Sequence, residues 1–171
     1  MSNNKWYNLK CLFLNITYMN GSGEMFYAKY DAMDVAEYVL WFCETMRNRP
    51  ISNLRLQKIL YYIQGSYLSD FDEPIFDNKI EAWTYGPVVP DVYYSYNSFV
   101  GNKITGVVSD GSLFDSSEIY LIQEVIDAKI NIPVWDLVED THNEMPWRMN
   151  YQEGKKVVIP TLDIKDFFDN N

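Results

Sequence analysis

The sequence predicts a mainly α-helical fold: a single compact helical domain of about six helices with a small β-hairpin or short-strand element. Two long segments, residues 32–47 and 52–68, repeat apolar residues at helical spacing. A third, residues 80–93, combines a short alternating stretch, a Gly-Pro turn and a proline suited to a helix start. The chain has 171 residues, 47% of them hydrophobic, which is enough for one domain with its own core.

The first helix is expected over residues 32–47. Asp31 is placed to cap it, and Asp34 puts a second carboxylate at the positive end of the helix dipole. Apolar residues recur at intervals of three and four along one face: Val35, Val39, Phe42 and Met46. Arg47 and Pro50 then supply a positive charge and a helix breaker, which predict the end of the helix.

The second helix is expected from a cap at Ser52 to about Leu68. Its apolar face consists of Leu56, Ile59, Leu60, Ile63 and Tyr67. Gly65 inside a helix costs about 1 kcal/mol relative to alanine, so we expect it to permit the close approach of another backbone. The two helices predict an antiparallel pair. A DNA-reading helix-turn-helix is disfavoured, because only Arg55 and Lys58 supply positive charge.

Residues 80–93 are expected to form a rigid corner. The stretch 81–83 alternates weakly, as a short strand does. Pro87 has no N–H to donate and restricts Gly86, so we expect the strand ladder to be broken there. Pro90 suits the first turn of a new helix, which we expect to run to about residue 99.

The remaining elements are shorter. Further helices are predicted at residues 116–126 with Ser116 as the cap, at 134–141, at 147–151 and at 161–168 with Thr161 as the cap. Extended structure is predicted as a small hairpin over 76–83 that turns at 77–79, a strand over 104–108 and a buried run over 157–159.

Residues 1–29 look like an N-terminal extension of a domain at residues 30–171. Within it, residues 9–19 are compatible with a strand and residues 20–23 with a turn. Two later methionines offer alternative starts. The sequence therefore leaves open whether this segment is an edge strand or precedes the true start of the protein.

The charge is strongly negative and unevenly spread. The formal net charge is −10, and residues 109–171 carry most of it. Direct nucleic-acid binding is disfavoured, because a phosphate backbone requires clusters of Lys and Arg. An acidic surface instead suits solubility or a basic protein partner.

The location expected from the sequence is the cytoplasm. No apolar run approaches the roughly 20 residues that a membrane span needs, and no convincing secretory leader is present. Cys11 and Cys43 are far apart and lack the CxxC spacing, which argues against a disulfide framework and against a zinc site.

The chemistry of the sequence favours a protein that binds rather than catalyses. No nucleophile motif and no phosphate-binding glycine loop is present, and we predict no metal and no cofactor. A hydrolase hypothesis stays open, and it requires three side chains in one pocket: Glu81, His142 and Glu144. We favour a structural role for His142, with Trp147 packed beside it.

Three groups of residues resemble the Panacea-domain (SocA-like antitoxin) family of bacteria and phages. The first group resembles the second-helix signature of the family: Leu56, Gln57, Lys58, Ile59, Leu60, Tyr61, Tyr62 and Gly65. The second is similar to its most specific motif: Glu81, Ala82, Trp83, Tyr85, Gly86, Pro87, Val88, Val89 and Pro90. The third is similar to its late H-x-x-x-P-W pattern: His142, Pro146 and Trp147. We call these the first, second and third motif groups.

The resemblance implies an antitoxin that neutralises a co-encoded protein toxin. Neutralisation would occur by direct contact or, as for SocA-like members, by delivery of the toxin to a cytoplasmic AAA+ protease. The motif residues are then expected to define the fold. The alternatives are an acidic, nucleic-acid-mimicking inhibitor of a basic protein and a phage-associated interaction protein with another target. The oligomeric state stays open.

Tyrosines on the helix expected at residues 90–99 are our predicted partner contacts. They are more numerous than one buried face needs: Tyr93, Tyr94 and Tyr96. Tyrosine suits interfaces because its ring supplies a large contact area and its hydroxyl a hydrogen bond.

Overall fold

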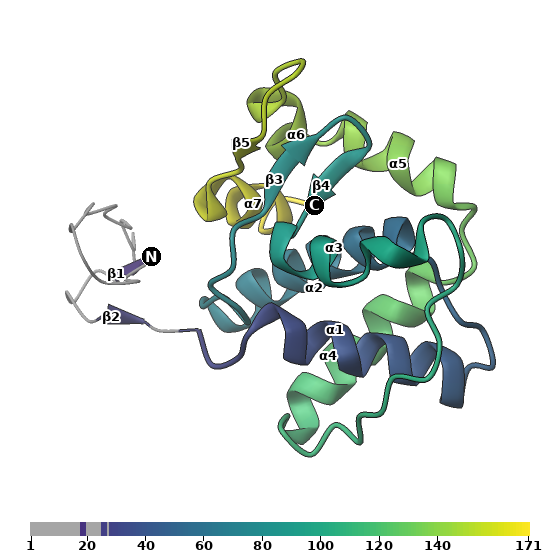
Figure 1. The fold of residues 1–171 in the computed structure, drawn as a ribbon. Coiled ribbons are helices and arrows are strands. Elements are labelled where there is room, and N and C mark those ends of the chain that lie inside the picture. Colours follow the sequence, from purple (N-terminus) through teal and green to yellow (C-terminus); the bar gives the residue numbers. More distant parts are fainter. Residues whose placement is uncertain (1–17, 20–24, 27) are drawn as a thin grey trace.

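The structure is a computed structural model that describes residues 18–19, 25–26 and 28–171. The α-helices are α1 (Ala32–Trp41), α2 (Asn53–Phe71), α3 (Pro90–Ser95), α4 (Ser116–Lys129), α5 (Val134–Asn143), α6 (Met145–Asn150) and α7 (Thr161–Phe168). A π-helix, η1 (Phe42–Met46), continues α1, and a 3-10 helix, η2 (Asn97–Phe99), follows α3. The strands are β1 (Tyr18–Met19), β2 (Met25–Phe26), β3 (Glu81–Trp83), β4 (Gly86–Val88) and β5 (Val157–Val158). The mainly helical fold class is confirmed (Figure 1).

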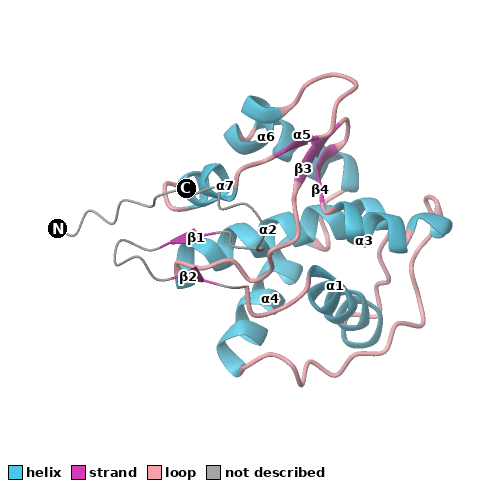
Figure 2. Cartoon of the chain, turned by 60° about the vertical axis from the view of Figure 1, so that its left-hand side comes forward, coloured by secondary structure: helices cyan, strands magenta, loops and turns pink. Residues whose placement is uncertain are grey.

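Helix α2 is the centre of the fold. It contacts α1, α4, α5, α7 and strand β4. In both views α1 and α4 lie on one side of α2, and strands β3 and β4 lie on the other (Figures 1 and 2). Most of α2 is buried, including polar side chains such as Gln57 and Lys58. A helix enclosed on all sides needs internal hydrogen-bond partners for these groups.

Two of the expected helix caps are observed differently. Asp31 caps α1 as predicted, and the side chain of Asp34 adds a reciprocal bond that completes a capping box. The cap of α4, however, is Asp115 rather than Ser116, because the Asp115 carboxylate accepts from two backbone N–H groups and completes a capping box with Glu118. Ser52 precedes α2, as expected, but its side chain makes no capping hydrogen bond.

The start of α7 also differs from the prediction. Pro160 occupies the cap position, and Thr161 is the first helical residue rather than the cap. Proline cannot supply a capping side chain, so this helix starts without a side-chain cap.

The prediction that Gly86 and Pro87 break the ladder was wrong. Strand β4 pairs antiparallel with β3 through a two-residue turn, with Trp83 opposite Gly86 and Ala82 opposite Pro87. Beside a two-residue turn the first pair exchanges hydrogen bonds, and the next pair points its backbone polar groups outward. Pro87 therefore gives up no ladder bond. It also lies on an edge strand of the order β4-β3-β5, where proline is tolerated.

Three other predictions of extended structure need correction. The hairpin lies at residues 81–88 and turns at 84–85, not over 76–83. No strand forms over 104–108, where the described chain makes a backbone hydrogen bond from Ile104 to the carbonyl of Ile51 instead. Of the run at 157–159, only Ile159 is buried, because β5 is the other edge of the sheet.

The N-terminal segment is described only in part. Tyr18–Met19 and Met25–Phe26 pair antiparallel, which supports strand structure at the end of the predicted range. Residues 9–17, the turn at 20–23 and Cys11 lie outside the described residues. In the described part of the chain, every helix is too short or too polar to cross a membrane.

Gly65 permits the approach of an aromatic ring rather than of a backbone. A Cβ atom at this position would overlap the ring of Phe168, which belongs to α7. That ring also packs edge-to-face against Tyr61 at 5.7 Å between centroids. Because Gly65 has no side chain, the Phe168 ring has room to pack there, and α7 can dock on α2.

Replacement of Gly65 by alanine should therefore destabilise the protein. Overpacking costs about 1–3 kcal/mol and outweighs the helix propensity of alanine, worth about 1 kcal/mol. In a Phe168→Ala background the clash is gone, so the same Gly65→Ala change should stabilise. Urea unfolding of the four proteins of this cycle measures both values. A stabilising effect of Gly65→Ala in the wild-type background would contradict the packing argument.

Candidate functional site

Polar side chains of α2 hold the second motif group in place. Gln57 Oε1 accepts a hydrogen bond from the backbone N–H of Val89 at 2.8 Å, and Gln57 Nε2 donates to Asn53 Oδ1 at 2.9 Å. Asn53 Nδ2 in turn donates to the carbonyl of Tyr93 at 3.0 Å. Both amide side chains are buried. These bonds satisfy the buried amides and join α2 to the backbone that leads into α3.

Lys58 is fully buried against Gly86. Its Nζ atom donates to the carbonyl of Pro87 at 2.9 Å, and no carboxylate of the described residues lies within ion-pair distance. Burial lowers the pKa of Lys58 to about 7. Gly86 has a φ angle of 98°, and a Cβ atom there would lie 2.7 Å from Lys58 Nζ and 2.6 Å from Thr141 Oγ1. This position therefore requires glycine for its backbone and for its contacts.

The third motif group packs against the β3–β4 hairpin. The His142 ring stacks on Trp147 with centroids 3.9 Å apart. The Trp147 indole donates to the carbonyl of Trp83 at 2.9 Å. The expected neighbours His142 and Trp147 are thus in contact. All three motif groups, distant in sequence, meet at the hairpin.

The hydrolase hypothesis required three side chains in one pocket: Glu81, His142 and Glu144. Instead, Glu81 accepts a hydrogen bond from the Trp83 indole at 2.8 Å. Glu144 accepts from the hydroxyls of Tyr61 at 2.7 Å and Tyr62 at 2.8 Å, and burial raises its pKa. These side chains engage separate partners, and none of the three lines the groove described next. The described ranges also contain no group of three or more His, Cys, Asp or Glu side chains that could hold a metal ion.

A groove of about 610 Å³ lies between the β3–β4 hairpin, α3, the start of α2, the first turn of α5 and the loop before β5. Its aromatic lining consists of Trp83, Tyr85, Tyr93 and Trp135. Tyr85 and Trp135 are 56% and 59% exposed, and their rings meet edge-to-face with centroids 5.6 Å apart. Lys155 and Lys156 also line it. We call it the aromatic groove.

The tyrosines predicted as partner contacts divide between two environments. Tyr93 lines the aromatic groove, and Tyr94 is exposed, with its hydroxyl accepting a hydrogen bond from Lys156 Nζ at 2.7 Å. Tyr96 is partly buried and packs against the hydrophobic core, with Phe99 beside it. The structure therefore leaves Tyr93 and Tyr94 next to the groove and turns Tyr96 toward the interior.

Trp135 was not singled out from the sequence, although a signal was present. The buried residues of α5 follow helical spacing: Leu137, Val138 and Thr141. Trp135 falls outside this stripe and sits beside the acidic Asp136. A large aromatic residue outside the apolar stripe of a helix is a candidate for contact with another molecule.

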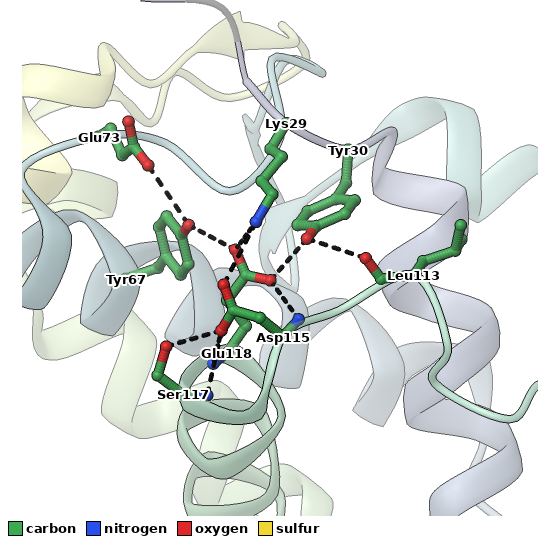
Figure 3. A network of polar contacts seen from close by, with 8 residues as sticks. All are labelled: Lys29, Tyr30, Tyr67, Glu73, Leu113, Asp115, Ser117 and Glu118. Carbon is green, nitrogen blue, oxygen red and sulfur yellow. Dashed lines mark hydrogen bonds and ion pairs between the residues drawn. The ribbon is translucent and has the colours of Figure 1, made fainter.

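A second polar cluster, centred on Glu118, ties the residues before α1 to α4 (Figure 3). Glu118 is 2% exposed, and its carboxylate accepts hydrogen bonds from Lys29 Nζ at 2.9 Å, Tyr67 at 3.0 Å and the hydroxyl of Tyr30. It also accepts from the backbone of Asp115 at 2.8 Å. Burial opposes ionisation, but these donors keep the pKa of Glu118 below its ordinary value. This cluster contributes to the fold rather than to the groove.

We expect Glu118→Gln to lower the free energy of unfolding by about 2 kcal/mol. The Glu118 carboxylate offers two acceptor oxygens to its hydrogen-bond donors, whereas the amide of glutamine offers only one. Glu124→Gln is the matched control, since Glu124 is exposed on the same helix. Urea unfolding at neutral pH measures the difference. Equal effects of the two substitutions would contradict the role assigned to the cluster.

Comparison with known proteins gives a consistent result. A family model described as "Antitoxin SocA-like, Panacea domain" matches residues 56–148, more than half of the chain, and this range contains all three motif groups. Antitoxin SocA of Caulobacter vibrioides (strain NA1000 / CB15N) is 47% identical over 49 residues, which are 29% of this chain and 26% of that protein. The match thus spans about a quarter of that relative's length. No solved structure matches the chain. The chain belongs to the SocA-like antitoxin family with a Panacea domain.

Proposed function

We propose that this protein is an antitoxin that neutralises a co-encoded toxin by binding it directly, with the aromatic groove as part of the binding surface. The observation that carries the proposal is the exposed pair Tyr85 and Trp135, each more than half exposed at the groove. Tryptophan and tyrosine dominate the binding energy of protein interfaces.

Family membership supports the same proposal. The name of the relative from Caulobacter vibrioides describes an antitoxin. The motif groups supply hairpin and helix contacts at the base of the groove, through Gln57 and Trp83 among others. We infer that the motif residues other than Tyr85 define the scaffold, and that Tyr85, Tyr93, Tyr94 and Trp135 face the toxin. The proposed site of action is the cytoplasm.

The test is growth of a host that expresses the neighbouring gene with and without this protein. We expect arrest by the neighbour alone and recovery with the wild-type chain. Trp135→Ala should weaken recovery, whereas Tyr120→Ala should not, because Tyr120 is 66% exposed on α4 and lies outside the groove lining. A harmless neighbour, or arrest that the wild-type chain does not relieve, would contradict the proposed function.

Two modes of neutralisation fit the proposal and can be separated. If the antitoxin masks the toxin, the two proteins co-purify and the toxin persists in the cell. If the antitoxin is an adaptor, the toxin disappears in the presence of an AAA+ protease and accumulates in a host that lacks it. Immunoblots of the toxin in both hosts distinguish these modes.

A second candidate function is an acidic inhibitor of a basic protein. Helix α5 exposes three carboxylates, none of them in an ion pair within the described residues: Asp136, Glu139 and Asp140. An interface built on such charges would weaken steeply with salt. Binding that persists at high ionic strength would contradict this candidate and leave the aromatic surface as the main contact.

A further inference from the structure

The charge of the aromatic groove is opposite to that of the protein as a whole. The chain carries a formal net charge of −10. Yet the charged side chains that line the groove are Lys155 and Lys156, and no carboxylate is among its lining residues. A cationic wall on an acidic protein attracts an anionic group to this position, because the surrounding surface repels it elsewhere.

Neither lysine is neutralised by an ion pair. Lys155 Nζ donates to the side-chain oxygen of Gln152 at 2.9 Å. Lys156 Nζ lies 4.1 Å from the centroid of the Trp83 ring and hydrogen-bonds to the Tyr94 hydroxyl at 2.7 Å. Within the described part of the chain, no carboxylate is within ion-pair distance of either ammonium group. Both retain N–H donors for a ligand, since an ammonium group has three.

The apolar part of the groove lies next to this cationic wall. Tyr85 and Trp135 are each more than half exposed, and Val100, also in the lining, is 81% exposed. Aromatic surface beside fixed positive charge suits a ligand with an apolar side chain and a carboxylate close together.

We propose that the aromatic groove receives an acidic segment of the toxin, with an apolar side chain against Tyr85 and Trp135 and carboxylates on Lys155 and Lys156. This inference rests on the proposed antitoxin function and specifies its partner chemistry. It predicts that the toxin contributes a short segment in which Asp or Glu neighbours a large apolar residue.

A protein carboxylate fits the groove better than a nucleic acid does. The amide side chains in the lining, Asn53 and Gln57, already bond to each other and to backbone groups, so they are not free to recognise a base edge. Two lysines suffice for one or two carboxylates but not for a run of phosphates.

The test selects short random peptides, displayed on phage, against the full chain. We expect the enriched peptides to carry Asp or Glu beside an aromatic or large aliphatic residue. A synthetic peptide of the enriched sequence should bind the K155E/K156E variant at least about tenfold more weakly than the wild type. Replacement of its acidic residues by lysine should reverse this preference. Lys79→Glu is the charge control, because Lys79 is exposed and outside the groove.

A matched pair of variants tests the contribution of the aromatic side chains to peptide binding. Tyr85→Ala should weaken peptide binding about tenfold, and Tyr120→Ala should leave it unchanged. Three results would overturn the proposal: no enrichment of acidic residues, equal losses for Lys79→Glu and K155E/K156E, or tighter binding of single-stranded oligothymidylate than of the peptide.

Assays with the toxin itself then test this inference separately from the proposed antitoxin function. If the K155E/K156E variant neutralises the toxin as well as the wild type does, the inference fails and the antitoxin function stands. If acidic peptides bind the groove but the neighbouring gene product is neither toxic nor bound, the antitoxin function fails.

Discussion

Gly86→Ala should lower the free energy of unfolding by about 3 kcal/mol, the combined cost of a strained backbone and an overpacked contact. The φ angle of Gly86 is 98°, a conformation that L-residues rarely adopt. The new methyl group would also lie 2.8 Å or less from Lys58 Cε and Nζ and from Thr141 Oγ1. These groups are buried and cannot move aside freely. Urea unfolding followed by tryptophan fluorescence measures the effect.

Gly106→Ala isolates the backbone contribution. Gly106 also has a positive φ angle, 79°, but a Cβ atom there would meet no heavy atom within 4 Å. We expect this control to cost about 1 kcal/mol from strain alone. If the two substitutions cost the same, the contact between Gly86 and Lys58 does not contribute to stability, and the packing of the hairpin on α2 must be reconsidered.

The buried Lys58 should make the protein more stable as pH rises from 7 to 9. The pKa of this lysine is about 7 in the folded protein and 10.5 as its ordinary value. Between these values the unfolded chain binds one proton more than the folded chain, so the free energy of unfolding rises with pH. One pKa unit corresponds to 1.36 kcal/mol, and the gain from pH 7 to pH 9 is about 2 kcal/mol. Below about pH 6 both states hold the proton, and this contribution no longer changes.

Other groups with a shifted pKa affect stability mainly outside the range from pH 7 to pH 9. Burial lowers the pKa of His142 from 6.5, so its effect falls in more acidic solution, where protonation of the unfolded chain reduces stability. Burial raises the pKa of Cys43 to about 12, so its effect begins above the ordinary value of 9.0, where stability falls with rising pH.

Lys58→Met tests the assignment. The variant should show a flatter dependence of unfolding free energy on pH between 7 and 9 than the wild type. Lys79→Met, at an exposed lysine, should keep the wild-type slope. A Lys58→Met variant with the full wild-type slope would show that the buried ammonium is not the group responsible.

Local features of the structure could be predicted from sequence because they depend on near neighbours. The Asp31 and Asp34 cap of α1 needs only residues within one helical turn, and the spacing of apolar residues over 52–68 marks α2 directly. Predictions failed where the structure depends on how one strand pairs with another. Pro87 looked like a ladder breaker, and only the register with β3 reveals that its nitrogen faces away from the partner strand.

The candidate site was only partly predictable for the same reason. The motif groups indicated the family and a binding role, but not that Lys58 supports Gly86 or that Trp147 contacts Trp83. Trp135 lies far along the chain from Tyr85, so their contact could not be read from either segment alone.

The sequence by itself determined the helical class, the order of the helices, the acidic character of the chain and its family resemblance, because each depends on local spacing or on composition. The tertiary structure decided which side chains meet. It placed two lysines of an acidic chain beside exposed aromatic rings, enclosed a lysine without a carboxylate partner and turned Tyr96 inward. These outcomes follow from the packing of distant segments around α2, since burial and proximity are properties of the folded chain.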